Sequence, residues 1–170
     1  MFVLGIDPGL SRCGYGLVVR KEGDRMRARA AGVLETDPAL PLADRLLVLH
    51  RELHSLLEEM RPQVVVVERV FFQVNAKTAM SVGQASGLAL LAAAAAGCEV
   101  AQYTSNEVKQ AVVGYGSATK EQVQRMVAAV LGLSEPPRPP DVADALALAA
   151  CHLTTQPLRR AVAAAAGEAP

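Results

Sequence analysis

Two carboxylates stand where two buried strands are predicted to end. Asp7 follows the apolar run 2–6, and Glu68 follows the four valines of residues 64–67. In open α/β sheets, ligands bind at the carboxyl ends of the strands. If these two strands are neighbours, both carboxylates project into one crevice.

Two more acids open the last predicted helix. Asp141 and Asp144 are three residues apart, which places them on one helix face. Four clustered carboxylates repel one another unless some are protonated or a cation balances their charge. Mg²⁺ prefers carboxylate and water oxygens, and two ions about 3.5–4 Å apart can hold the attacking and leaving oxygens of a phosphoryl transfer. The four acids predict a site for two Mg²⁺ ions, with Mn²⁺ as a substitute, that hydrolyses phosphodiesters.

Each acid also has a purely structural interpretation. Asp7 could accept N–H groups of a following turn, and Glu68 could form an ion pair with Arg69. Asp141 could cap the last helix, and Asp144 could interact with its dipole. Each of these alternatives accounts for one acid, whereas a metal site accounts for all four together.

The elements that must position the acids form an α/β pattern. Apolar or alternating runs predict strands over residues 2–6, 13–20, 25–30, 64–67 and 99–103. Helical spacing predicts helices over residues 42–60, 76–96, 104–114, 118–131 and 141–154. This order predicts a five-stranded mixed sheet, in which antiparallel hairpin strands join parallel strands through crossover helices, with helices on both faces.

The composition fits one folded domain. The chain has 170 residues, of which 51% are hydrophobic and 20% charged, and this excludes a disordered chain. Seventeen basic residues balance seventeen acidic ones, so binding of nucleic acid through bulk positive charge is not expected. We predict a single domain over residues 1–156 and a flexible tail over 157–170.

The cysteines and the long apolar stretch bear on the compartment. Cys13, Cys98 and Cys151 are far apart and form no CxxC pair, so we expect neither disulfides nor a structural zinc site, and a reducing cytoplasm is the simplest setting. The N-terminal apolar run is short and lacks a basic region, so no signal peptide is predicted. The uncharged stretch 78–98 is mostly alanine and contains polar residues, which favours a buried helix over a membrane span.

Four sequence blocks resemble the signature blocks of the RuvC family of bacterial Holliday-junction resolvases. They are GIDPGLSRCGYG (5–16), VVVERVFFQVNAKTAMSVGQASG (65–87), VKQAVVGYGSATKEQVQRMV (108–127) and DVADALALA (141–149). Their order and spacing also fit, and the resemblance covers about residues 1–155. Because four blocks must coincide, the resemblance is specific.

The resemblance implies an RNase H-like fold and a homodimer. It also implies Mg²⁺-dependent nicking of two opposed strands of a four-way DNA junction in homologous recombination and repair. In-line hydrolysis at such a site leaves 5′-phosphate and 3′-hydroxyl ends. The acids carried over are Asp7, Glu68, Asp141 and Asp144, and some members have histidine where this chain has Asp141. A branch-migration motor as partner is implied by the resemblance alone.

Two aromatic residues close to Glu68 are candidates for contact with the junction. Phe71 and Phe72 are adjacent, and in a loop at least one of them is expected to be exposed. An exposed aromatic ring beside an active site can stack on bases or wedge between them. The resemblance favours Phe71 as the wedge. The alternative is that each ring anchors the loop in the core.

Four basic residues are candidates for phosphate contacts. Lys109 and Lys120 fall in blocks that resemble the DNA-contacting segment of the family, while Arg69 and Lys77 lie near Glu68 in the sequence. Each could hold a phosphate as a positive charge. The alternative for each is an ordinary solvated surface position.

The segment 88–96 contains only leucine and alanine, and it predicts a helix covered on every side, either by its own fold or by a second subunit. We expect a homodimer interface that includes part of residues 76–96. Two other functions stay open at this point. One is a junction-binding module without catalysis. The other is an actin-like nucleotide-binding ATPase, although the chain is short for two lobes and has no GK[ST] phosphate loop.

Overall fold

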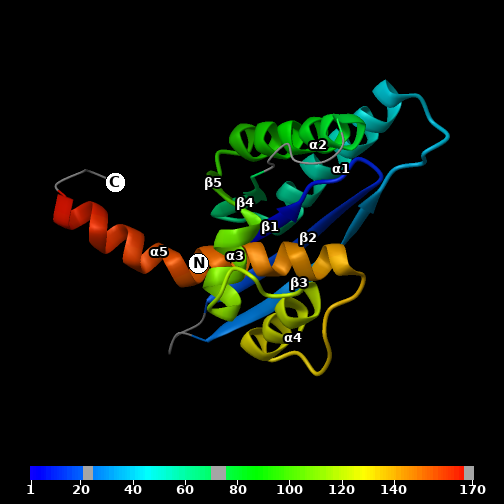
Figure 1. Ribbon diagram of the computed structural model, residues 1–170. Coiled ribbons are helices and arrows are strands. Elements are labelled where there is room, and N and C mark those ends of the chain that lie inside the picture. Colours follow the sequence, from blue (N-terminus) through cyan, green and yellow to red (C-terminus); the bar gives the residue numbers. More distant parts are fainter. Residues whose placement is uncertain (21–24, 70–75, 167–170) are drawn as a thin grey trace.

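Five strands form one mixed sheet in the part of the chain that the computed structural model describes, which is residues 1–20, 25–69 and 76–166. The sheet order is β3-β2-β1-β4-β5 (Figure 1). The strands are β1 Phe2–Asp7, β2 Arg12–Arg20, β3 Met26–Glu35, β4 Val64–Glu68 and β5 Glu99–Tyr103. Strands β1, β2 and β3 pair antiparallel, whereas β4 is parallel to both β1 and β5. The predicted mixed sheet is confirmed, and β1 is a neighbour of β4.

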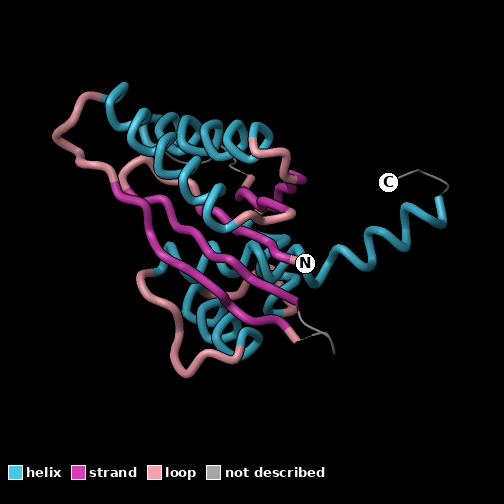
Figure 2. The backbone as a smooth tube through the Cα atoms, turned by 180° about the vertical axis from the view of Figure 1, so that it is seen from behind, coloured by secondary structure: helices cyan, strands magenta, loops and turns pink. Residues whose placement is uncertain are grey.

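Helices cover both faces of the sheet (Figures 1 and 2). One face carries α1 Leu42–Met60 and α2 Ala76–Ala95. The opposite face carries α3 Ser105–Val113, α4 Lys120–Leu131 and α5 Pro140–Ala166. None of the described helices combines the length and apolar content required to cross a bilayer.

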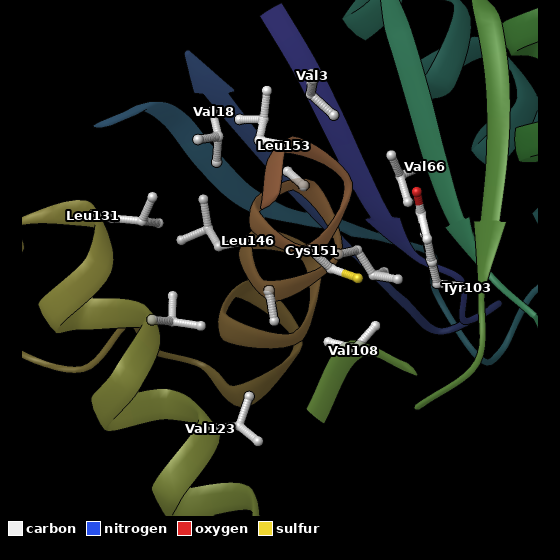
Figure 3. Close-up of a cluster of buried hydrophobic side chains, with 14 of the residues drawn as sticks. Val3, Val18, Val66, Tyr103, Val108, Val123, Leu131, Leu146, Cys151 and Leu153 are labelled. Atoms are coloured by element: carbon white, nitrogen blue, oxygen red, sulfur yellow. The ribbon is translucent and has the colours of Figure 1, made fainter. Parts of the chain in front are cut away.

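Alternation along the strands sorts their side chains between two apolar clusters. Val3 and Val66 belong to the cluster on the α5 side, and Figure 3 shows both pointing toward that helix. Leu4 and Ile6 belong to the cluster under α1 and α2. Because side chains alternate along a strand, Asp7 faces the same side as Val3, and Glu68 faces the same side as Val66. Both acids therefore lie on the face that α5 covers.

Glycines let α5 pack directly on the sheet. A Cβ added at Gly5 in β1 would meet the backbone oxygen of Ala145 at 1.9 Å. One added at Gly14 in β2 would meet the backbone oxygen of Asp141 at 2.2 Å. Such distances leave no room for any side chain. The close approach brings the first turns of α5 down to the carboxyl end of β1.

Replacing Gly5 with Ala is expected to destabilise the protein by roughly 2–3 kcal/mol, because an overpacked core must shift backbone as well as side chains. The obstacle is the α5 main chain, which cannot rotate away. Urea unfolding followed by circular dichroism measures the effect. Gly32→Ala in β3 is the matched control, because the nearest atoms to a Cβ there belong to the side chain of Tyr15, which can move, and not to a backbone. Equal stability of the two variants would contradict direct packing of α5 on β1.

Helix α5 extends beyond its predicted end near residue 154, and its backbone stays helical through 157–166, part of the segment predicted as a tail. Pro157 has no N–H to donate to the carbonyl of Leu153, four residues earlier. The guanidinium of Arg20 donates to that carbonyl instead. Alanine, the strongest helix former, dominates the residues that follow. This last portion of α5 projects away from the sheet (Figures 1 and 2).

Candidate active site

The pairing of β1 with β4 brings the first two acids together. Ile6 is opposite Val67 in this parallel pair, so the next residues along the two strands are Asp7 and Glu68. Both side chains point to the α5 face, as the alternation requires. The expectation that Asp7 and Glu68 share one crevice is met by strand register alone.

Helix α5 supplies the third acid of this crevice. Asp144 lies beside Asp7 and Glu68 in a cleft of about 200 Å³. The other residues lining the cleft come from α3, α4 and α5; they are Ser105, Val108, Lys109, Lys120, Val123, Ala147 and Leu148. Three carboxylates and two ammonium groups therefore meet over an apolar floor.

Burial and mutual repulsion make the three carboxylates hard to ionise. The pKa of Asp7 rises to about 7, first because the carboxyl is buried and then because Asp144, Glu68 and Asp141 are negatively charged nearby. Burial also raises the pKa of Glu68 and of Asp144, and another carboxylate adds to each shift. Raised carboxyl pKa values in a cleft mark a site that gains from an added positive charge.

Lys120 supplies part of that positive charge. Its Nζ lies 3.6 Å from Oδ2 of Asp144, and its charge opposes the rise in pKa of Asp7, Glu68 and Asp144. The lysine is the first residue of α4, whose start is held by a capping box in which the Thr119 hydroxyl accepts from the backbone N–H of Gln122. The cap thus fixes where the ammonium group enters the cleft.

Asp141 is placed differently from the other three acids. Its carboxylate does not line the cleft; instead, Oδ2 accepts a hydrogen bond from Nε of Arg12 at 3.1 Å. The same guanidinium donates through Nη1 to Oε1 of Glu35 at 3.0 Å. Asp141 remains close enough for its charge to raise the pKa of Asp7 and Asp144.

The chemistry of the acids fits a divalent cation. Among the described residues, no three His, Cys, Asp or Glu side chains are grouped so that they could hold one ion as they stand. Two of the acids are engaged by basic side chains, Asp141 by Arg12 and Asp144 by Lys120. The donors are nevertheless carboxylate oxygens, which Mg²⁺ prefers, and their raised pKa values reflect an excess of negative charge that such an ion would offset.

The structure describes the positions of some of the predicted DNA-contacting residues but not of others. Lys109 and Lys120 line the cleft. Arg69 is exposed directly after Glu68, and its backbone N–H donates to the carbonyl of Tyr103. Phe71 and Phe72 lie outside the described residues, as does the side chain of Lys77 at the start of α2.

Two features of the site were not foreseen from the sequence. Arg12 contacts Asp141. The only indication of this in the sequence is that Arg12 lies inside the block 5–16. Ser105 also lines the cleft, from the first turn of α3. Neither residue belongs to a motif whose spacing alone indicates a role.

The raised pKa of Asp7 predicts an unusual pH dependence of stability. The folded protein retains the Asp7 proton up to about pH 7, whereas the unfolded chain loses it near the ordinary aspartate pKa of 3.8. The folded state therefore binds more protons in that window, and stability falls as pH rises through it. We expect a loss of roughly 3–4 kcal/mol in EDTA between pH 4 and pH 8, measured by urea unfolding.

The matched control for this pH dependence is Asp7→Asn. That variant should lose most of the dependence, whereas Asp44→Asn on the exposed surface of α1 should keep it. A stability that rises between pH 4 and pH 8 in both the parent and Asp7→Asn would contradict the electrostatic account of the cleft.

Comparison with known proteins gives consistent matches over nearly the whole chain. The family model described as "Crossover junction endodeoxyribonuclease RuvC" matches residues 3–152. A crossover junction endodeoxyribonuclease RuvC of Syntrophomonas wolfei is 52% identical over 153 residues, which cover 90% of this chain and 88% of the relative. One from Salinispora arenicola is 53% identical over 169 residues, covering 99% and 97%.

Solved structures show the same similarity. The Thermus thermophilus RuvC structure superimposes with a TM-score of 0.86 at 40% identity, covering 94% of this chain and 97% of that one. The T. thermophilus RuvC in complex with Holliday junction substrate gives a TM-score of 0.84 at 37% identity, covering 93% and 96%. The similarity to these structures confirms the predicted fold class, an α/β fold of the RNase H-like kind with a five-stranded mixed sheet.

Proposed function

The chain belongs to the RuvC family of crossover junction endodeoxyribonucleases, and on that basis we propose that it resolves four-way DNA junctions in homologous recombination and DNA repair. The reaction is the nicking of two opposed strands, leaving 5′-phosphate and 3′-hydroxyl ends. One structural observation supports the chemistry most strongly. Asp7, Glu68 and Asp144 come from three separate elements and meet in a single cleft that also holds two lysines.

Each acidic residue of the site has a definite task in this proposal. Asp7, Glu68 and Asp144 would hold two Mg²⁺ ions, with Asp141 as a fourth ligand and Mn²⁺ as a substitute metal. Bound there, the ions would supply Lewis-acid activation of water and of the scissile phosphate. The paired ends of β1 and β4, and α5 packed directly on the sheet, hold these half-buried carboxylates in place.

Basic and aromatic residues around the cleft would position the DNA. Lys109 and Lys120 lie where they can neutralise the backbone phosphate of the strand to be cut. Arg69 is exposed at the end of β4, beside Glu68. Lys77, which lies near Glu68 in the sequence, would be a further phosphate contact, and by family resemblance Phe71 rather than Phe72 would be the junction wedge.

A two-fold dimer would present two such clefts to the two opposed strands. The face of α2 away from the sheet carries Met80, Gly83, Gly87 and Leu91, with Met80 65% and Leu91 58% exposed. A Cβ at either glycine would have no neighbour within 4 Å, so the backbone of a second copy can approach closely. Within one chain only one face of α2 is covered, so the helix is not buried on all sides by its own fold. We propose that a second copy of the chain covers the exposed face.

The comparison of a junction with a linear duplex tests this function. A labelled synthetic junction and a duplex of matched sequence are each incubated with the protein in Mg²⁺ and in EDTA. We expect nicks on the junction only, in Mg²⁺ only, and products that a ligase can seal. Tight junction binding without nicks in Mg²⁺ or Mn²⁺ would favour the non-catalytic binding module, and tight nucleotide binding without junction binding would favour the actin-like alternative.

A further inference from the structure

Arg12 links the rim of the cleft to the edge of the sheet. It begins β2, pairs with Glu35 across the β2–β3 ladder, and donates one hydrogen bond to the carboxylate of Glu35 and one to that of Asp141. Its guanidinium therefore joins β2, β3 and α5. In this arrangement the carboxylate of Asp141 is held at the rim and does not line the cleft.

Asp141 is nevertheless adjacent to the catalytic acids. The Cβ of Asp141 would lie 3.0 Å from a Cβ built on Gly14, and Gly14 is the residue opposite Asp7 in the β1–β2 ladder. The charge of Asp141 also acts on the ionisation of Asp7 and Asp144. The ion pair with Arg12 is thus the contact that must break before the Asp141 carboxylate can join Asp7, Glu68 and Asp144 in the cleft.

That ion pair is easy to exchange. The side chain of Arg12 is 45% exposed and that of Asp141 is 29% exposed, and ion pairs in contact with water contribute little to stability. A guanidinium can bind a phosphate through two parallel hydrogen bonds, as it can bind a carboxylate. A DNA phosphate at the mouth of the cleft would compete with Asp141 for Arg12.

We propose that Arg12 is a positioning residue that holds Asp141 away from the metal site until a DNA phosphate takes its guanidinium. Release of Asp141 then adds a carboxylate to the cleft, so DNA and a divalent cation strengthen each other's binding. Such coupling is reciprocal, because the free energy gained is the same in whichever order the two ligands bind. The inference rests on the proposed function, since it requires junction DNA at this cleft.

The first experiment measures Mn²⁺ binding to the protein without DNA by isothermal titration calorimetry. Freed from Arg12, Asp141 should join the other acids, so Arg12→Gln is expected to bind Mn²⁺ about threefold to fivefold more tightly than the parent. In an Asp141→Asn background, the same substitution should have no effect beyond that of lost positive charge. A merely structural role for Arg12 would leave Mn²⁺ affinity unchanged or reduced.

Two matched variants separate this role from simpler effects. Glu35→Gln removes the other ion pair of Arg12 while leaving its contact with Asp141, and it should leave Mn²⁺ affinity unchanged. Lys109→Gln removes a positive charge that lines the cleft and measures the general electrostatic effect. The effect of Arg12→Gln must exceed that of Lys109→Gln.

The second experiment measures junction binding in EDTA, so that the competition between Asp141 and a DNA phosphate for Arg12 is tested without any metal. Asp141→Asn frees Arg12 for a phosphate and should tighten junction binding. The tightening should be about threefold to fivefold greater when Arg12 is present than in the Arg12→Gln background. Additive effects of the two substitutions would overturn the inference.

The outcomes distinguish failure of the inference from failure of the proposed function. If the parent neither binds nor cuts the junction, the function is wrong, whatever the Mn²⁺ titration shows. If the parent cuts the junction but Mn²⁺ affinity is the same in Arg12→Gln, or changes equally in the Asp141→Asn background, the function stands and the role of Arg12 is wrong.

Discussion

Replacing Asp7 with Asn should abolish junction cleavage while leaving junction binding intact. Asp7 lies at the centre of the cleft, where the charges of Glu68, Asp141 and Asp144 all act on it. An amide of the same shape keeps the fold but removes the negative charge that would hold a divalent cation. We expect the cleavage rate to fall by more than about a thousandfold, as for loss of a central group in preorganised catalysis.

Binding and cleavage must be measured on the same preparations to make this result specific. Asp44→Asn on the exposed surface of α1 is the matched control and should cut at the parental rate. Asp141→Asn should lose less activity than Asp7→Asn, because Asp7, Glu68 and Asp144 still line the cleft in that variant. An Asp7→Asn protein that cuts as fast as the parent would remove the basis for the proposed site.

Replacing Leu91 with Asp should convert the proposed dimer into a monomer. Leu91 is on the exposed face of α2, in line with two glycines over which a second backbone could pack. A carboxylate buried there would face its own copy across the two-fold axis and would lose its hydration. Sedimentation at micromolar concentration should show a particle of about half the mass of the parent.

A control must show that the dimer is lost because of the position of the substitution and not because of the added charge. Met126→Asp places the same group on an exposed position of α4, on the opposite face of the sheet, and should leave the dimer intact. Monomeric Leu91→Asp should also cut the two strands of a junction independently, so that singly nicked junctions accumulate. A parent that sediments as a single chain of 17.9 kDa, or a Leu91→Asp dimer, would contradict the assignment of α2 to the interface.

Strand patterns in the sequence predicted the sheet and two of its acids well. The continuous valines of 64–67 require a strand buried on both faces, and β4 is such a strand at the centre of the sheet. A charged residue that ends such a run lies at the sheet edge where neighbouring strands also end. These patterns left open whether β1 and β4 are neighbours; the structure shows that they pair in parallel, and their register then places Asp7 beside Glu68.

Features set by tertiary contacts could not be predicted in the same way. Gly5 and Gly14 were part of a family block, but only the packed α5 shows that any side chain there would meet its backbone. The contact between Arg12 and Asp141 spans 129 residues, and no periodicity links positions so far apart. Helix α5 continues past Pro157, and the carbonyl of Leu153 accepts a hydrogen bond from the guanidinium of Arg20 in β2, a contact that no helical periodicity predicts.

The most direct test labels each of the four strands of a synthetic junction in turn and maps its cuts with the parent protein in Mg²⁺ and in EDTA. We expect one nick in each of two opposed strands, at symmetric positions, with none in EDTA and none when Asp7 is replaced by Asn. Cuts that persist in EDTA, or cuts by the Asp7→Asn protein at the parental positions and rate, would contradict a metal-dependent site built on Asp7, Glu68 and Asp144.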